Sequence, residues 1–302
     1  ATYWSYGTSF TVITAAMLET ALGTDFGLYE VPGLRESAVF RSLGVAPSGL
    51  YYNFADCGDE RDRRGDATLA WFAAKSGNAA FFEQERFLLP PSELGKPGRL
   101  DGAALAWIAR FEPKESERMP AVWKGDGPNP IVIFKSGADD PHRYYFGGKG
   151  GQATSSHGNM DAGSFVFELD GVRWVLDPGN QGYHALEKTG FNLWGRAQDS
   201  QRWTLLTKNN FGHSTLTVND ELFVANAFAP LIEFGGDEAP SASFDLSGVY
   251  GTNVVRAVRQ FVKDSPVSLV VEDRITVSGN TDALTWQLIT TADVEMAKGG
   301  AI

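Results

Sequence analysis

Four polar side chains that could do chemistry surround one short predicted hairpin. His157, Asn159 and Asp161 precede its first strand, and Asp177 follows its second. Between them, apolar and polar residues nearly alternate, and Asp170-Gly171 is a pair typical of a two-residue hairpin turn. The residues before the first strand and after the second should therefore meet at one end of the hairpin. Polar loops held on such a scaffold are typical of binding and catalytic sites.

A metal site is one interpretation of these residues. Asn159, Asp177 and His213 each flank a predicted strand, and an amide oxygen, a carboxylate and an imidazole can hold a divalent ion such as zinc. The plainer alternative is structural: Asp177 shapes a turn before Pro178, and His213 caps a strand. A metal-dependent hydrolase built on His157, Asp177 and His213 is a further alternative, which predicts activity that a chelator abolishes.

Proton transfer is the second chemistry that the sequence offers. His157 lies between Ser156 and Gly158, which predicts a loop position from which an imidazole can reach solvent and act as acid or base. Tyr3 and Tyr6 stand beside a glycine at the expected entrance to a helix, where a phenol can line a cleft. Tyrosines at such positions are also ordinary packing anchors.

Cations and aromatic rings further along the chain could bind a substrate. Tyr183 follows a glycine turn, and Arg196 and Arg202 accompany Trp194 and Trp203. Guanidinium groups and aromatic faces together bind carboxylates and sugars. The same residues could instead form a domain interface.

Composition restricts the class of partner. The chain has 302 residues, 43% of them hydrophobic, which allows one large core or two modest ones, and its formal net charge is -11. A nucleic-acid partner is not expected, because the acidic excess leaves no broad basic surface. No stretch approaches the roughly 18 apolar residues of a membrane span. The single cysteine, Cys57, cannot form an intrachain disulfide.

Residues 1–112 predict a helical domain. A first amphipathic helix is expected from a cap at Thr8 or Ser9 to a stop at Gly23, because apolar residues recur at helical spacing between them. Further helices are expected at 34–43, 66–75, 78–87 and 101–111. Three connecting features are also expected: a solvated loop of mixed charge at 56–64, a proline-rich break at 89–92 and a polar hinge at 113–119.

From 120 to 302 the sequence changes to β character. Short apolar runs alternate with turn residues such as Asn219-Asp220, which predicts many antiparallel strands and a β-sandwich. The expected strands are 131–134, 143–146, 165–169, 172–176, 215–218, 254–262, 268–271 and 283–288. The predicted fold class is therefore α+β, with a helical domain followed by an antiparallel β-sandwich.

Two blocks carry a resemblance to a known family: SHGNMDAGSFVFELDGVRWVLDPGNQGY and, further on, FGHSTLTVND. Both resemble the heparinase II/III-like polysaccharide lyases, in particular the heparinase II type. The segments ATYWSYGTSF and YYNFADCGDE resemble the end of that family's α/α-toroid, so the resemblance covers nearly the whole chain. It implies the C-terminal part of an α/α-toroid followed by a β-sandwich that is truncated at its C-terminal end.

The resemblance also implies a reaction and roles for particular residues. The family cleaves uronic-acid-containing polysaccharides by β-elimination, which needs a base, an acid for the departing O4 and a neutraliser of the substrate carboxylate. Tyr3 matches the family's catalytic tyrosine, with Tyr6 as the alternative, and His157 matches its catalytic histidine. The family's neutralising residues belong to helices before the tyrosine, so activity is expected of a longer parent protein.

The same resemblance implies a structural zinc site. Asn159, Asp177 and His213 match the family's structural zinc ligands, except that a histidine is expected where Asn159 stands. Zinc at this position would fix the hairpin, and its loss should cost order more than chemistry.

The sequence therefore predicts a polysaccharide lyase that acts on an acidic glycan such as heparin or heparan sulfate. Alginate or another uronan is the alternative substrate. A non-catalytic glycan-binding protein is the alternative class, and it would bind without turnover. A polymeric substrate implies a periplasmic or secreted protein. Whether the chain forms a homodimer is left open by the sequence.

Overall fold

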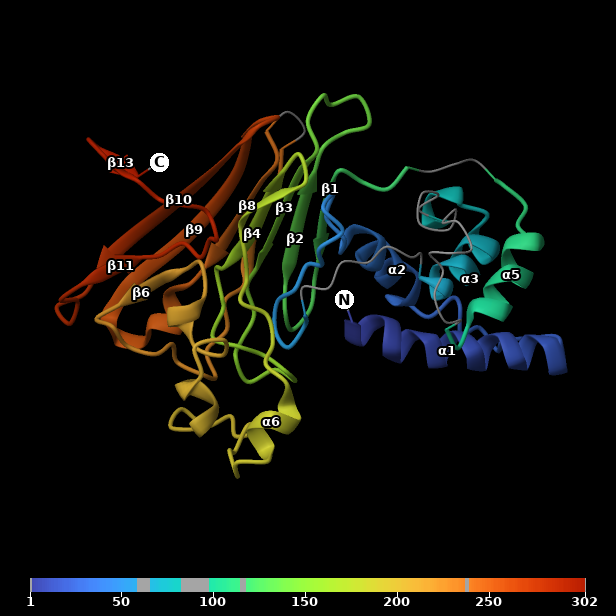
Figure 1. Cartoon of the computed structure of the whole chain (residues 1–302), viewed down its shortest axis with the longest axis horizontal. Coiled ribbons are helices and arrows are strands. Elements are labelled where there is room, and N and C mark those ends of the chain that lie inside the picture. Colours follow the sequence, from blue (N-terminus) through green and yellow to red (C-terminus); the bar gives the residue numbers. More distant parts are fainter. Residues whose placement is uncertain (1, 59–65, 83–97, 115–117, 237–238, 302) are drawn as a thin grey trace. The chain divides into compact units, whose positions relative to one another are not determined.

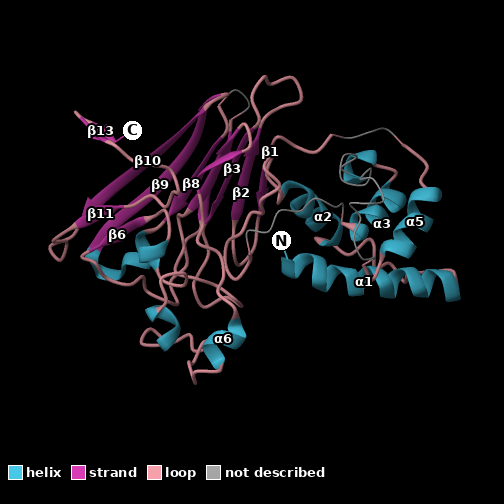
Figure 2. Ribbon diagram, in the orientation of Figure 1, coloured by secondary structure: helices cyan, strands magenta, loops and turns pink. Residues whose placement is uncertain are grey.

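The computed structural model describes residues 2–58, 66–82, 98–114, 118–236 and 239–301. Contacts divide the chain into two compact units. Unit 1 comprises Ala1–Tyr52 and Asp59–Pro120, and unit 2 comprises Asn53–Gly58 and Ala121–Ile302. The long helices belong to unit 1 and the sheets to unit 2 (Figure 1, Figure 2). The predicted mixture of helices and antiparallel sheets is therefore confirmed.

Unit 1 is built around helix α3. Its described helices are α1 (Thr2–Leu22), α2 (Leu34–Leu43), α3 (Ala67–Ser76), η1 (Ala79–Phe82) and α5 (Asp101–Ala109). Helix α3 contacts each of the other four. Residues Leu69–Ala73 are buried without interruption, as expected of a helix that is apolar on every side. The helix begins at Asp66, whose side chain accepts a hydrogen bond from the Thr68 N–H.

Helix α1 begins earlier than the sequence predicted. It starts at Thr2, so the predicted caps Thr8 and Ser9 lie inside it, and the Ser9 hydroxyl donates to the Tyr6 carbonyl. A glycine inside a helix costs only about 1 kcal/mol, which a helix of 21 residues can offset. The predicted stop is confirmed, because Gly23 has a φ of 76°, the left-handed conformation that ends many helices.

Several predicted features lie wholly or partly outside the described residues: the end of the helix 78–87, the break at 89–92, most of the loop 56–64 and the centre of the hinge 113–119. The domain limits 1–112, 113–119 and 120–302 stay predictions. In the described part of the chain, no helix has both the length and the apolar character needed to cross a lipid bilayer.

Unit 2 contains two main antiparallel sheets. One has the strand order β1-β2-β3-β4-β5, and the other has the order β10-β9-β8-β7. The strands of the first are β1 (Val122–Gly125), β2 (Ile131–Lys135), β3 (Tyr144–Lys149), β4 (Phe165–Leu169) and β5 (Val172–Val175). Those of the second are β7 (Leu231–Gly235), β8 (Ser241–Asp245), β9 (Val254–Ser265) and β10 (Ser268–Val277). The sequence did not predict β1, β7 or β8.

Smaller elements complete unit 2. Two further strand pairs are β6 (Leu216–Val218) with β11 (Leu284–Trp286), and β12 (Met296–Ala297) with β13 (Gly300–Ala301). The short helices are α6 (Tyr183–Glu187), η3 (Gln201–Thr204), η4 (Asn210–Gly212) and η5 (Ser247–Asn253). Helices α6, η3 and η4 all lie in the long excursion of the chain between β5 and β6. This excursion contacts the segment that precedes β4, because Arg202 donates to the Gly158 carbonyl.

Aromatic side chains join the two main sheets in one core. Phe146 on β3 lies 4.9 Å from Phe261 on β9 between ring centroids, and Phe165 on β4 lies 5.4 Å from the same ring. Phe134 on β2 faces Phe234 on β7 at 6.4 Å. Because these contacts come from three strands of the first sheet, that sheet is a firm support for the loops at its ends.

Candidate functional site

The hairpin predicted from the sequence is formed by β4 and β5. Asp170 and Gly171 connect the strands, and both have positive φ, 53° and 82°, as a type I′ turn requires. At the opposite end, ligand atoms of Asp161, before β4, and Asp177, after β5, lie within 4.8 Å of each other and of His213. The predicted meeting of polar residues at one end of the hairpin is confirmed for Asp161 and Asp177.

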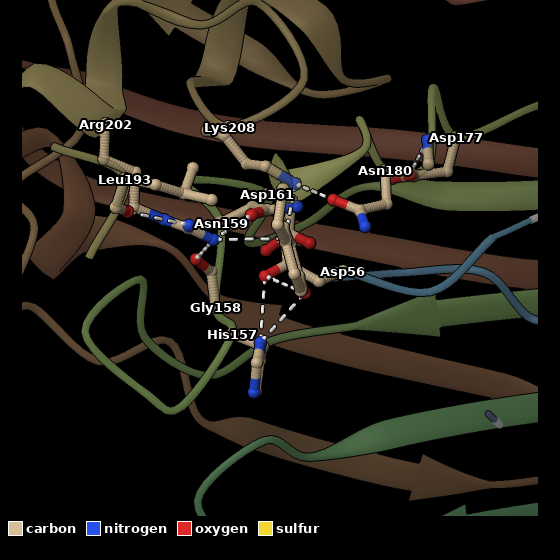
Figure 3. Close-up of polar contacts among 12 residues, drawn as sticks. Asp56, His157, Gly158, Asn159, Asp161, Asp177, Asn180, Leu193, Arg202 and Lys208 are labelled. Carbon is tan, nitrogen blue, oxygen red and sulfur yellow. Dashed lines mark hydrogen bonds and ion pairs between the residues drawn. The ribbon is translucent and has the colours of Figure 1, made fainter. Parts of the chain in front are cut away.

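A buried carboxylate, Asp56, is the centre of a second polar cluster. Its Oδ1 accepts hydrogen bonds from Lys208 Nζ and, at 3.2 Å, from Arg202 Nη2. Its Oδ2 lies 3.0 Å from His157 Nδ1 and accepts from the Tyr183 hydroxyl at 2.9 Å (Figure 3). The prediction of a solvated loop is wrong at Asp56, which is 5% exposed, because four polar partners replace its water.

Electrostatics favour the ionised form of this carboxylate. Burial by itself raises the pKa of Asp56, but the hydrogen bond and charge of Lys208, with the charge of Arg202, outweigh burial and lower that pKa. Burial lowers the pKa of Lys208, and the Asp56 carboxylate acts against that effect. With two cations against one buried carboxylate, Asp56 is ionised at neutral pH.

His157 stands on the loop that the sequence predicted. Its backbone has a φ of 59°, which is uncommon for a residue other than glycine. Nδ1 faces Asp56, and the other ring nitrogen points away from the cluster (Figure 3). An ionised carboxylate only accepts hydrogen bonds, so in the neutral ring the proton belongs on Nδ1. The side chain is 26% exposed, and its outward nitrogen can accept a proton.

Trp194 and Arg196 line a small recess around His157, and Tyr183 packs against the imidazole ring. The ring of Trp194 is nearly perpendicular to the imidazole at 5.5 Å, and the ring of Tyr183 is stacked at 6.2 Å. Arg196 lines the same recess and donates to the Thr154 carbonyl. Aromatic faces and guanidinium groups suit sugars and carboxylates. The structure thus places the sequence-predicted residues Arg196 and Arg202 in the lining of the recess around His157, and it places Tyr183 against the His157 ring.

Arg202 supports this recess from the interior. It is buried, and its Nη2 donates to Asp56, to the Gly158 carbonyl at 2.9 Å and to Asn159 Oδ1 at 3.0 Å. Its Nη1 donates to the Leu193 carbonyl at 3.2 Å. These contacts give Arg202 the position of a residue that orients the His157 loop, while contact with a substrate stays a prediction.

The predicted metal ligands differ in how they are held. Asp177 Oδ2 and His213 Nδ1 lie 2.9 Å apart in the interior. Asn159 Oδ1 is taken by Arg202, and its Nδ2 has no partner. Asp161, a carboxylate, completes the group with Asp177 and His213. Two carboxylates and an imidazole fit zinc chemistry, whereas the unpartnered amide nitrogen of Asn159 is a donor and does not.

The environment of His213 shifts its pKa. Burial lowers the pKa of His213, but the charge of Asp177 and the hydrogen bond to it outweigh burial, and the pKa is raised. The pairing with Asp177 therefore favours the protonated form of His213. A metal ion and that proton compete for the same imidazole.

The predicted tyrosines lie on α1, in unit 1. Tyr3 and Tyr6 are both exposed, and they share a helix face because they are three residues apart. Tyr6 also packs edge-on against Phe10 with ring centroids 5.3 Å apart. Both phenols can be presented to a ligand, and the pairing of either one with His157 rests on the family resemblance.

Sequence reasoning missed Asp56 and Lys208. Asp56 lies in the block YYNFADCGDE, whose resemblance to the family was the one available signal. It is 101 residues from His157 along the chain and 152 from Lys208. No spacing rule connects residues so far apart, so their contact could not be read from the sequence.

Comparison with known proteins identifies the family. The sequence model of the heparinase II/III-like C-terminal domain matches residues 145–302, a range that includes His157, Asp177 and His213. The chain belongs to the heparinase II/III-like family. This match does not separate the heparinase II type from the heparinase III type. No functionally curated protein matches the sequence.

Solved structures share the fold of this heparinase II/III-like chain. A heparan sulfate lyase HepC mutant from Pedobacter heparinus is 16% identical, with a TM-score of 0.65 over 98% of this chain and 41% of that one. HepC itself is 15% identical, with a TM-score of 0.60 over 96% and 41%. A heparinase III is 12% identical, with a TM-score of 0.58 over 96% and 42%. The chain thus spans about two fifths of their length.

Proposed function

We propose that this heparinase II/III-like chain is the C-terminal part of a polysaccharide lyase that cleaves acidic glycans by β-elimination. One observation carries the assignment of the site. His157 is a partly exposed imidazole, held at Nδ1 by Asp56, with its outward nitrogen directed away from the cluster. Family membership supports the proposed reaction class. Heparin or heparan sulfate is the proposed substrate class, since the similar structures include heparan sulfate lyases and a heparinase.

The proposed reaction removes the C5 proton of a uronate, breaks the C4–O4 bond and forms a double bond between C4 and C5. His157 accepts the C5 proton at its outward nitrogen, and the buried carboxylate of Asp56 stabilises the resulting imidazolium. Tyr3 donates a proton to the departing O4, a role that rests on the family resemblance. Tyr6 is a second phenol on the same helix face.

Substrate contacts are proposed for the recess around His157. Trp194 and Tyr183 offer aromatic surface to a sugar ring. Arg196 offers a guanidinium to a carboxylate or sulfate. Neutralising the carboxylate of the reacting uronate is assigned to residues of a longer protein, as the resemblance implies.

The wider architecture belongs to the same proposal. Unit 1 is the end of an α/α-toroid, and the two main sheets of unit 2 form a β-sandwich. A zinc ion at the end of the hairpin would stabilise the loop positions and supply no step of the reaction. Because acidic polysaccharides are polymers outside the cytoplasm, the protein is periplasmic or secreted.

The test is ultraviolet absorbance of polysaccharide solutions incubated with the full-length protein. A rise from the conjugated unsaturated uronate on heparin or heparan sulfate is the expected result. A rise on alginate alone would move the substrate to another uronan. Saturable binding by calorimetry without any rise would overturn the lyase assignment in favour of a glycan-binding protein. Cleavage that a chelator abolishes and that gives no double bond would indicate a hydrolase.

A further inference from the structure

Three polar side chains of unit 1 form a cluster beside the first turns of α1. The Ser5 hydroxyl donates to Asp66 Oδ2 at 2.6 Å, and the Arg41 Nε–H is shared between the Ser5 oxygen and Asp66 Oδ2, at 3.0 Å from each. Arg41 and Asp66 are buried, with side-chain exposures of 3% and 9%. Hydrogen bonds to charged groups are stronger than bonds between neutral groups. The cluster is therefore a firm attachment point for Ser5.

Asp66 connects this cluster to the buried centre of unit 1. Its Oδ1 accepts from the Thr68 N–H at 2.9 Å and so caps α3, while its Oδ2 faces Ser5 and Arg41. Arg41 belongs to the last turn of α2. One carboxylate thus fixes Ser5 of α1 relative to two other helices, and its own orientation is set by the helix that it caps.

Ser5 lies on a different side of α1 from the two phenols. At 3.6 residues per turn, its side chain is turned by about 160° from Tyr3 and by about 100° from Tyr6. The neighbouring Trp4 packs against Phe72 of α3, with ring centroids 6.1 Å apart. Tyr3 and Tyr6 are 49% and 63% exposed. Because Trp4 and Ser5 are held against the other helices, the rotation of this turn about the helix axis is fixed, and the phenols face outward.

The helix is intrinsically weak directly after the phenols. Gly7 follows Tyr6, and glycine is a poor helix former. No atom lies within 4 Å of the position that a Gly7 Cβ would occupy, so close packing does not require a glycine there. A turn beside such a residue depends on tertiary contacts for a single orientation. The contacts of Ser5 and Trp4 supply them.

We propose that Ser5, Arg41 and Asp66 are positioning residues for the phenol of Tyr3, an inference that rests on the role proposed for Tyr3 as proton donor to the departing O4. Proton transfer requires the donor to lie within hydrogen-bond reach of the leaving oxygen. A misplacement of about 1 Å can lower a rate by roughly a hundredfold. The three residues take no proton themselves. They act by holding the turn that presents the phenol.

Hydrogen exchange tests the positioning without reference to lyase activity. Ser5→Ala removes the hydroxyl and leaves the Arg41–Asp66 ion pair in place, so the variant should fold. Ser9→Ala is the matched control, since it makes the same change one turn later on the same helix, where the hydroxyl donates within α1. In the full-length protein, we expect amide exchange at residues 3–7 to be about tenfold faster in Ser5→Ala than in Ser9→Ala. Equal exchange in the two variants would overturn the positioning role.

Steady-state kinetics of the full-length protein test the consequence for the reaction. Ser5→Ala should lower kcat by about tenfold and keep KM within a few fold, because the phenol is misdirected while the glycan contacts remain. Ser5→Thr keeps a hydroxyl and should restore kcat, whereas Ser9→Ala should match the unchanged protein. Equal kcat values in Ser5→Ala and Ser9→Ala, with an inactive Tyr3→Phe, would overturn the proposal and leave the lyase assignment standing. An active Tyr3→Phe would overturn both the role of Tyr3 and its positioning.

Discussion

Replacing Asp56 by asparagine isolates the charge on which the site around His157 depends. The substitution keeps the shape of the side chain but turns one carboxylate oxygen into a donor. Asp56 Oδ1 faces two cations, Lys208 and Arg202, so the amide oxygen must stay there and the amide nitrogen must face His157 and Tyr183. The imidazole must then accept at Nδ1, which moves its proton to the outward nitrogen.

The size of the effect follows from burial. Removing one partner of a buried ion pair costs about 3–5 kcal/mol, because the other charge stays buried without compensation. Lys208 keeps Asn180 Oδ1 at 3.0 Å, and Arg202 keeps three other acceptors. We therefore expect a loss of about 3 kcal/mol, at the lower end of that range. In the proposed full-length lyase, the same variant should lose turnover, since the wrong nitrogen of His157 would carry the proton.

Urea denaturation, followed by circular dichroism, measures the stability part. Asp170→Asn is the matched control, since Asp170 also bonds to a histidine, His142, at 2.8 Å, but on the exposed surface. Its effect should be marginal, because water screens exposed pairs. A double-mutant cycle with Lys208→Met adds the second check, and we expect a coupling free energy of at least about 1 kcal/mol.

Two results would refute this reasoning. One is a urea denaturation midpoint that is the same for Asp56→Asn and for Asp170→Asn. The other is a coupling free energy near zero between Asp56→Asn and Lys208→Met. Either result would mean that water solvates Lys208 and Arg202 in the folded chain, so that they do not depend on the Asp56 carboxylate.

Three further outcomes are expected. In the proposed full-length lyase, Tyr3→Phe should abolish turnover and leave oligosaccharide binding within a few fold, because it removes a proton carrier and little surface. Near-normal kinetics would exclude Tyr3 as the proton donor. His157→Ala should lower turnover by about a hundredfold or more, and unchanged turnover would assign His157 to structure alone. Because the pKa of Asp56 is lowered, its ion pairs stabilise the fold above the unfolded pKa of about 3.9 and are lost as the pH falls through the folded value. Acid unfolding should therefore be less steep in Asp56→Asn than in the unchanged chain, and equal slopes would contradict the pKa assignment.

Local patterns predicted the hairpin and most helices because their determinants are local. Asp170 and Gly171 adopt the positive φ values that a two-residue turn needs, so the turn follows from two adjacent residues. Gly23 ends α1 for the same kind of reason. The start of α1 was misplaced because Thr8 and Ser9 are good caps in general, and only packing decides that the helix continues to Thr2.

Strands β7 and β8 show where the local signal fails. Strand β8 reads SASFD, and its small polar residues have little intrinsic preference for a strand. Ala242 and Phe244 are nevertheless fully buried, because β9 pairs with β8 and brings Phe261 against Phe244. These strands depend on pairing with each other and with β9, which no window of a few residues contains.

Asp56 shows the same limit for the site. A carboxylate in a charged stretch predicts a solvated loop, since burying it alone is costly. Burial becomes favourable only when Lys208 and Arg202 are known to surround it, and both come from the excursion between β5 and β6. The residue that orients the His157 ring is therefore 101 residues away in the sequence, and no local pattern could identify it.

Arg202 connects the two polar clusters of unit 2. One of its nitrogens donates to Asp56, which holds His157, and also to Asn159, which precedes Asp161 by two residues. A change in the Asp161 group must therefore act on the segment that presents His157. This connection explains why an asparagine suits position 159: a second histidine there could ligate an ion, but a protonated or metal-bound imidazole could not accept from the guanidinium. The side chain at position 159 therefore serves to hold the loop of His157 in place.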